Sequence, residues 1–208
     1  MVAIVDYGVG NLFSLKSSLA HIGAEVVVTN NKEKLANADQ IILPGVGAFE
    51  DAAKKLRELG LDLIIKELVK NGKPLMGICL GMQMLFEKSY EYGEHEGLGL
   101  IKGNIVPIKD YISDEYKIPH IGWNPLNFKN STSPIFENIK DGDCVYFVHS
   151  YFATECEKSV IATTEYGAEL TAAVADKNVF GCQFHPEKSG KVGLNILKAF
   201  INLKEGQL

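Results

Sequence analysis

The sequence has few of the residues and patterns that mark secreted or membrane proteins. Its 208 residues contain only four cysteines, at positions 79, 144, 156 and 182, and no C-x-x-C pair. We therefore expect reduced thiols instead of a disulfide framework, and no metal site is predicted. No stretch approaches the ~20 apolar residues of a membrane helix. The N-terminal MVAIVDYG has no basic leader or cleavage site. We expect a cytoplasmic protein with no membrane partner.

Basic residues are also scarce relative to acidic ones. Lysine and arginine number 21 against 26 aspartates and glutamates, a net charge of -5, which provides no general attraction to nucleic acid. Cofactor motifs are incomplete as well. Phe13 stands where the third glycine of a dinucleotide fingerprint belongs, and Gly190-Lys191 lacks the remainder of a phosphate-binding loop. We predict no cofactor and no nucleic-acid partner.

Short apolar runs alternate with helical patterns in the first part of the chain. This alternation predicts right-handed parallel crossovers, and hence a three-layer α/β/α sandwich with a mainly parallel central sheet. The expected strands are residues 2–7, 25–29 and 40–43 and the run that ends at Cys79; the expected helices are residues 11–22, 48–59 and 61–70. The catalytic or binding site of such a sheet lies beyond the carboxyl ends of its strands.

The pattern changes after Phe86, where a polar, glycine-rich segment covers residues 89–99. The segments that follow look like strands without long helices between them, so we expect additional antiparallel strands in the second half. The candidates are residues 103–108, 144–152, 159–165, 170–176 and 179–184, followed by an amphipathic helix over residues 190–203. No repeat or linker composition interrupts the chain, and one domain is predicted over residues 1–208.

Cys79 stands between Gly77 and Gly81 in the segment KPLMGICLGMQMLF, where a strand is expected to turn into a helix. A glycine on each side lets strand and helix backbones pass closely behind a nucleophile, as in the serine nucleophile elbow. A helix beginning at residue 80 would place free N–H groups beside the sulfur and favour the thiolate. The alternative is a small, buried, apolar cysteine without chemistry.

Two further motifs can support a nucleophile at this position. The turn at residues 44–47, PGVG, ends a strand on the same sheet edge and can present backbone N–H groups to an oxyanion, or it is an ordinary strand-to-helix turn. His185 differs from the other histidines because Glu187 follows it across Pro186. A carboxylate there can orient the imidazole as the base that activates the thiol, although a structural histidine remains the alternative.

These motifs together resemble the class I, or triad, glutamine amidotransferases. The resemblance rests on GICLGMQ at residues 77–83, PGVGAF at residues 44–49 and HPE at residues 185–187, which occur in the family's order and span nearly the whole chain. Within this family, DYGVGNL, PHIGWN at residues 119–124, YFVHSY at residues 146–151 and HPEKSG resemble the glutamine amidotransferase subunits of imidazole glycerol phosphate synthase.

The resemblance implies a catalytic triad of Cys79, His185 and Glu187 that hydrolyses glutamine through a glutamyl thioester. It also implies the roles of other residues. The backbone N–H groups of the oxyanion hole would come from Val46, Gly47 and Leu80. The glutamine would be held by Gly45, Gln83, Ser150 and Tyr151.

The same resemblance implies a protein partner. Ammonia would pass to a cyclase subunit, a β/α barrel, in a heterodimer that makes imidazole glycerol phosphate and an aminoimidazole carboxamide ribotide. The implied contacts are Asn11, Trp123, Tyr146 and Lys188, with Trp123 either on an exposed rim or in the core. Two alternatives remain open, namely a related subunit that supplies ammonia for amidation of a nucleotide sugar, and a binding or regulatory module without activity.

Overall fold

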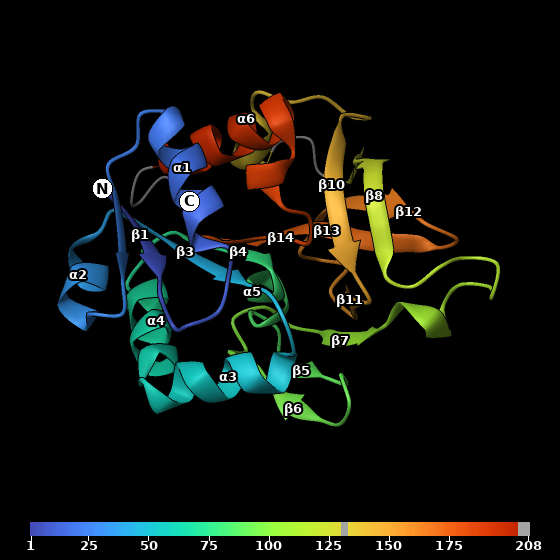
Figure 1. Cartoon of the computed structure of the whole chain (residues 1–208), viewed down its shortest axis with the longest axis horizontal. Helices are drawn as coiled ribbons and strands as arrows, with labels where there is room; N and C mark the ends of the chain where they lie inside the picture. Colours follow the sequence, from blue (N-terminus) through green and yellow to red (C-terminus); the bar gives the residue numbers. More distant parts are fainter. Residues whose placement is uncertain (130–132, 204–208) are drawn as a thin grey trace.

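The computed structural model describes residues 1–129 and 133–203, and they form three layers around a mixed sheet (Figure 1). The sheet has eight strands in the order β2-β1-β3-β4-β14-β13-β12-β9, of which the first five are parallel and the rest are antiparallel. The strands are β1 (Val2–Val5), β2 (Val26–Thr29), β3 (Gln40–Gly45), β4 (Leu75–Cys79), β9 (Asn127–Phe128), β12 (Val160–Glu165), β13 (Glu169–Asp176) and β14 (Val179–Cys182). The predicted fold class is confirmed.

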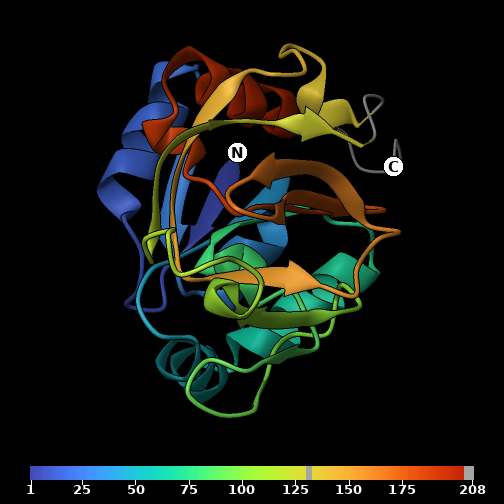
Figure 2. The ribbon, with the colours of Figure 1, turned by 90° about the vertical axis from the view of Figure 1, so that its right-hand side faces the viewer.

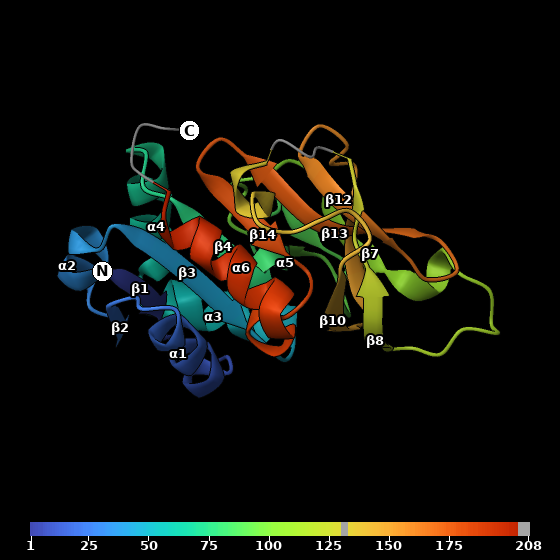
Figure 3. The same ribbon diagram turned by 90° about the horizontal axis from the view of Figure 1, so that it is seen from above.

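Helices cover both faces of the parallel part of this sheet (Figure 3). Successive side chains of a β-strand point to opposite faces of the sheet, so each strand contributes to both layers of helices. In β1, Ala3 and Val5 pack in one apolar cluster, and Val2 and Ile4 pack in the other. One cluster includes α2 (Lys32–Asn37), α3 (Phe49–Glu58) and α4 (Leu61–Lys70), and the other includes α1 (Leu12–His21) and α6 (Gly190–Ile201).

The helix α3 shows how the sequence selects this packing. Its buried residues Phe49, Ala52, Ala53 and Leu56 recur at helical spacing and form a single stripe facing the sheet. Burying a side chain as large as Phe49 stabilises the fold by roughly 1.5–3 kcal/mol relative to leaving it exposed. None of the helices in residues 1–129 and 133–203 is long and apolar enough to cross a membrane.

The second half of the chain adds two smaller sheets beside the main one (Figure 2). One pairs β8 (His120–Pro125) with β10 (Cys144–His149), and the other has the order β11-β7-β5-β6. The strands of the latter are β5 (Lys88–Ser89), β6 (His95–Glu96), β7 (Asn104–Pro107) and β11 (Tyr151–Thr154). Short 3-10 turns complete the chain as η1 (Ile108–Asp110), η2 (Pro134–Phe136) and η3 (Pro186–Lys188).

Two sequence-based expectations were wrong in detail. Residues 144–152 do not form one strand, because the chain breaks at Ser150 and its two parts pair with different sheets. The helix that follows Cys79 is also shorter than the apolar pattern to Phe86 indicates, since α5 covers only Leu80–Gln83. The apolar residues beyond α5 are instead buried in a turn. The strand β8 was not among the expected elements.

Candidate active site

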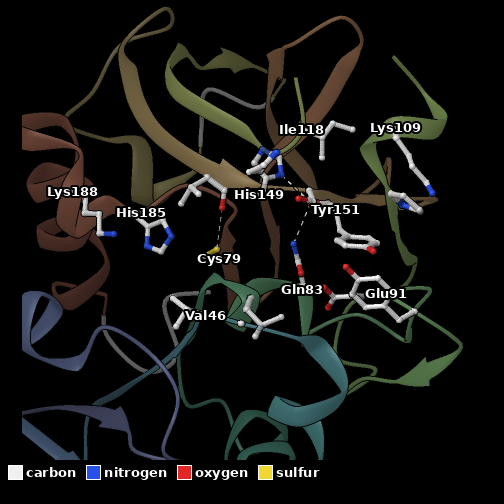
Figure 4. A pocket seen from close by; sticks show the side chains of 17 residues that line it. Val46, Cys79, Gln83, Glu91, Lys109, Ile118, His149, Tyr151, His185 and Lys188 are labelled. Carbon is white, nitrogen blue, oxygen red and sulfur yellow. Dashed lines mark hydrogen bonds between the residues drawn. The ribbon is translucent and has the colours of Figure 1, made fainter. Parts of the chain in front are cut away.

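A cavity of about 620 Å³ lies at the carboxyl ends of the parallel strands (Figure 4). The sheet, η3 and the Ser150 break all contribute to its wall, as expected for an open α/β sheet. Many of the predicted site residues line it together, namely Val46, Gly47, Cys79, Leu80, Gln83, Ser150, Tyr151, His185 and Lys188. Gly45 and Glu187 lie behind the wall, in a small adjoining cavity.

Cys79 sits at the sharp turn between β4 and α5. Its φ of 54° is a left-handed conformation that a non-glycine residue adopts only when the surroundings enforce it. The flanking glycines make this possible. A Cβ at Gly77 would lie 2.6 Å from the carbonyl oxygen of Gly81, and a Cβ at Gly81 would overlap the carbonyl of Leu43. The geometry is therefore that of a nucleophile elbow.

The short α5 changes the expected electrostatics at the sulfur. One turn of helix aligns few peptide dipoles, so the influence of a long helix is not present here. Sγ contacts the carbonyl oxygen of Val148 at 4.0 Å and Nε2 of Gln183 at 3.9 Å. The thiol is only 8% exposed, at the floor of the cavity.

The PGVG turn lies next to Cys79 because β3 and β4 are parallel neighbours. Their register pairs Gly45 directly with Cys79. The turn then continues with Val46, which is 42% exposed, and with Gly47 at a φ of 91° that favours glycine. The hydroxyl of Tyr7 donates to the carbonyl oxygen of Pro44 at 2.7 Å and holds the start of the turn from behind. The turn can thus face the reacting carbon.

His185 follows β14, which neighbours β4 on the side away from β3, and it lines the same cavity (Figure 4). Its Nδ1 lies 2.8 Å from Oε1 of Glu187, and both side chains are only 3% exposed. Burial by itself lowers the pKa of His185, but Cys79 and Glu187 outweigh it and raise the pKa to about 9. A protonated imidazole is therefore favoured beside a thiolate, the charge state that a cysteine nucleophile needs.

The backbone around His185 is fixed by the strand β10. The N–H of His185 donates to the carbonyl oxygen of Tyr146 at 3.0 Å. The hydroxyl of Ser189 donates to the carbonyl oxygen of His185 at 2.6 Å and accepts from the N–H of Tyr146 at 3.0 Å. Three hydrogen bonds therefore hold the imidazole over Cys79 on a rigid frame.

Gln83 is oriented by two acceptors. Its Nε2 donates to the carbonyl oxygen of Tyr151 at 3.2 Å (Figure 4). It also donates to Oε1 of Gln183 at 3.0 Å. Both amide protons are then used, so Oε1 of Gln83 is the atom left to accept a hydrogen bond from a ligand. Gln183, which is fully buried, was not found from the sequence, because one glutamine in an apolar strand carries no pattern.

The sequence interpretation also missed two opposite charges at the outer end of the cavity. Glu91 and Lys109 both line it and lie on opposite walls, with Tyr151 between them (Figure 4). Burial raises the pKa of Glu91, although a hydrogen bond from the backbone N–H of Phe49 at 2.6 Å acts against this. Both residues lie in or near irregular segments without a motif, so only the fold brings them together.

The residues predicted to contact a partner lie at the rim or beside it. Trp123 is 55% exposed, which excludes the core alternative, and its ring centroid lies 6.1 Å from that of Tyr146. Nζ of Lys188 lies 5.9 Å from the same tyrosine ring. Asn11 instead caps α1, where its side chain accepts from the N–H of Ser14.

Other apolar residues near the predicted contacts are exposed. They include Phe13 at 83%, Ile121 at 57% and Ile118 at 41%. Ile118 also lines the cavity, and Ile121 lies on β8 with Trp123.

No group of three or more histidine, cysteine or acidic side chains in residues 1–129 and 133–203 could hold a metal ion.

Comparison with known proteins places this geometry in a family. The model of the class I glutamine amidotransferases matches residues 3–203. The protein named imidazole glycerol phosphate synthase subunit HisH from Caldanaerobacter subterraneus subsp. tengcongensis is 50% identical over 201 residues, 96% of this chain and 97% of that protein. The protein of the same name from Geobacillus thermodenitrificans is 47% identical over 210 residues, 100% of this chain and 98% of that protein.

Solved structures agree on the architecture. The structure of PurLQS from Thermotoga maritima has a TM-score of 0.74 and 22% identity, covering 97% of each chain. A crystal structure described as glutamine amidotransferase has the same TM-score of 0.74 and 21% identity, covering 96% of this chain and 99% of the other. At this identity both matches bear on the fold alone. The family model and the identity to the relatives show that the chain belongs to the class I glutamine amidotransferases.

Proposed function

We propose that this chain is the glutaminase subunit of an imidazole glycerol phosphate synthase and acts in histidine biosynthesis. One observation carries the proposal, namely that Cys79 and His185 line a single cavity, with Glu187 bonded to His185 from behind its wall. The names of relatives that are 47–50% identical over nearly the whole chain support it. Residues 1–208 would act as one glutaminase domain in the cytoplasm.

The chemistry follows from the charge state of the triad. The Cys79 thiolate attacks the side-chain amide carbon of glutamine and forms a C–S bond, and the carbonyl π electrons move to oxygen. The imidazolium of His185 gives its proton to the amide nitrogen, the C–N bond breaks and ammonia leaves. A water molecule then gives a proton to neutral His185 and attacks the thioester, which releases glutamate and restores the thiolate. Glu187 keeps the Nδ1–H of His185 oriented throughout.

The oxyanion would be stabilised by backbone N–H groups on two sides of Cys79. Leu80 follows the nucleophile directly, and the Val46–Gly47 turn is carried past it by the Gly45–Cys79 register. Each such donor contributes roughly 3 kcal/mol of transition-state stabilisation. Gly47 is exposed and has a positive φ, so the turn has the conformational freedom to present its N–H groups.

Glutamine is a zwitterion with a neutral side-chain amide, and the cavity has matching groups along its length. Gln83 offers a free Oε1 near the middle. Farther out, Glu91 suits the α-ammonium group and Lys109 suits the α-carboxylate. The strand break places the backbone of Ser150 and Tyr151 along the same wall. Gly45, behind the wall, stays a prediction for glutamine binding.

A cyclase subunit with a β/α barrel would dock over the cavity mouth as a heterodimer. The exposed Trp123 and Ile121 on β8 and Phe13 on α1 are apolar side chains suited to burial in a protein interface. Lys188 is held over Tyr146 at the cavity rim and adds a charge for orientation. Ammonia released at Cys79 would then enter the barrel instead of water.

The experiment is a glutaminase assay with and without the cyclase subunit. We expect the free chain to hydrolyse glutamine slowly and the complex with the barrel and its bound ligand to do so faster. Cys79→Ser should abolish hydrolysis but still co-purify with the barrel, and Cys144→Ser, at an exposed cysteine, should behave as wild type. Retained activity in Cys79→Ser would remove Cys79 from the mechanism. If a cyclase neither bound the chain nor accelerated hydrolysis, and an enzyme that amidates a nucleotide sugar did both, that enzyme would be the acceptor of the ammonia.

A further inference from the structure

A buried row of polar side chains connects the glutamine pocket to the exposed face of β8. Nδ1 of His149 lies 2.8 Å from the carbonyl oxygen of Tyr151, the same oxygen that accepts from Gln83 (Figure 4). Nε2 of His149 lies 3.0 Å from Nδ1 of His120, and Nε2 of His120 lies 2.9 Å from Oδ1 of Asn124. None of these contacts is used by the triad.

The sheet explains why the two imidazoles meet. β8 and β10 are antiparallel, and His120 pairs with His149 in their register, so both side chains point to the same face. His120 is fully buried and His149 is 5% exposed. The ring of His120 is stacked on Phe147 at 5.0 Å and on Tyr166 at 4.0 Å. Stacking therefore fixes the plane of the His120 ring, and the contacts of its two nitrogens with His149 and Asn124 select one of the two flips within that plane.

Counting protons shows that the contacts, taken as they stand, cannot all be hydrogen bonds between neutral rings. The carbonyl of Tyr151 and Oδ1 of Asn124 only accept, so each end of the row needs an N–H from a ring. The contact between the rings needs a third N–H. Two neutral imidazoles carry two protons, so either the pair is charged or one end of the row is arranged differently.

Burial decides between these two states. It lowers the pKa of both histidines, that of His149 to about 3, so a charge on the pair is disfavoured. The alternative is to turn over the amide of Asn124, so that Nδ2 donates to His120. This gives up the 3.2 Å hydrogen bond from Nδ2 to the carbonyl oxygen of Glu165. Glu165 is exposed and water can hydrate that oxygen, so the turned amide costs less.

We propose that His120 and His149 are positioning residues, both neutral with the proton on Nδ1, in a row of hydrogen bonds from Asn124 on β8 to the glutamine pocket. In this row Asn124 donates to His120, His120 donates to His149, and His149 donates to the carbonyl oxygen of Tyr151. The proposal rests on the proposed function, because it assigns the row to the wall that holds Gln83. Asn124 neighbours the exposed Trp123 in sequence, so the row joins the expected docking strand to the substrate site through four residues.

The kinetic test compares two substitutions of His120 in the complex with the cyclase subunit. His120→Asn keeps a donor near the position of Nδ1, whereas His120→Phe keeps the stacking but leaves Nε2 of His149 without a partner. We expect His120→Phe to raise the KM for glutamine roughly tenfold, the size of one lost buried hydrogen bond, with a smaller change in kcat. His120→Asn should stay within about twofold of wild type. His21→Asn, at an exposed histidine, is the matched control and should change neither KM nor kcat.

The second measurement reads the protons directly and does not depend on activity. Long-range ¹H–¹⁵N spectra of the imidazoles, assigned with His120→Asn, should show both rings neutral with the proton on Nδ1 at neutral pH. A charged ring, or a proton on Nε2 of either ring, would overturn the proposal, as would equal KM values for the Phe and Asn variants. A wild-type chain without glutaminase activity would refute the proposed function, while the spectra would still decide the proton arrangement.

Discussion

Replacing Glu187 by glutamine changes one charge in the triad and almost nothing in its shape. The Glu187 carboxylate accepts from Nδ1 of His185 at 2.8 Å, and both side chains are 3% exposed, so solvent screens the contact little. Hydrogen bonds to charged groups contribute about 1.5–3 kcal/mol, roughly twice the value for neutral pairs. The second oxygen, Oε2, is buried without a hydrogen-bond partner among the described residues, so a new NH₂ group there would also be unsatisfied.

The amide oxygen of glutamine still accepts from Nδ1 as a neutral acceptor, so about half of this contribution is lost, roughly 0.8–1.5 kcal/mol of transition-state stabilisation or about 4- to 13-fold in kcat/KM. The pH profile should change as well. His185 must be protonated to form the ion pair with the thiolate, and its pKa is raised to about 9, so wild-type kcat/KM should fall as the pH rises through about 9. Without the Glu187 charge the pKa of His185 falls, and this limb should move to lower pH.

The assay is steady-state glutamine hydrolysis in the cyclase complex across a pH series, with glutamate as the measured product. Glu33→Gln is the control, because Glu33 is an exposed residue of α2 outside the cavity. It should leave both kcat/KM and the pH limb unchanged. If Glu187→Gln kept wild-type kcat/KM and a high-pH limb near 9, the assignment of Glu187 to the triad would be refuted.

Two further predictions test the elbow and the substrate pocket. Gly81→Ala should lower the free energy of unfolding by roughly 1–3 kcal/mol or more, because its Cβ would overlap the Leu43 carbonyl of β3. Thermal unfolding measures this, and a melting temperature equal to that of the wild type would contradict it. Lys109→Met should raise the KM for glutamine about tenfold or more and change kcat less, because a charge-assisted hydrogen bond to the α-carboxylate is lost. Lys158→Met, at an exposed lysine, is the control, and an equal KM in the two variants would exclude Lys109 from substrate binding.

The sequence predicted the parts of the site that depend on local backbone geometry. Gly77 and Gly81 have one physical reason to flank Cys79, the close approach of β3, β4 and α5, and the structure shows this approach. The adjacency of Gly45 and Cys79 likewise follows from parallel neighbouring strands. Apolar periodicity also indicated most strands and helices of the first half, where each element buries one regular face, but it missed the short helix α2, in which only Leu35 is buried.

The parts that were missed depend on contacts between distant segments. The break at Ser150 has no local signal, because the segments on both sides are rich in residues typical of strands. The two halves separate because β10 pairs with β8 and β11 pairs with β7, which belong to different sheets. Gln183, Glu91 and Lys109 lie in segments without a motif, and only the folded chain brings them to one cavity. The short α5 was missed because buried apolar residues in a turn resemble a helical stripe.

Trapping the covalent intermediate shows whether Cys79 is the nucleophile. The complex is mixed with glutamine, quenched in acid within the first turnovers, and digested for mass spectrometry. We expect one γ-glutamyl group attached to the peptide that contains Cys79, and none in Cys79→Ser. A glutamate-producing enzyme in which Cys79 stays unmodified, or in which the group is found on Cys144, Cys156 or Cys182, would contradict it.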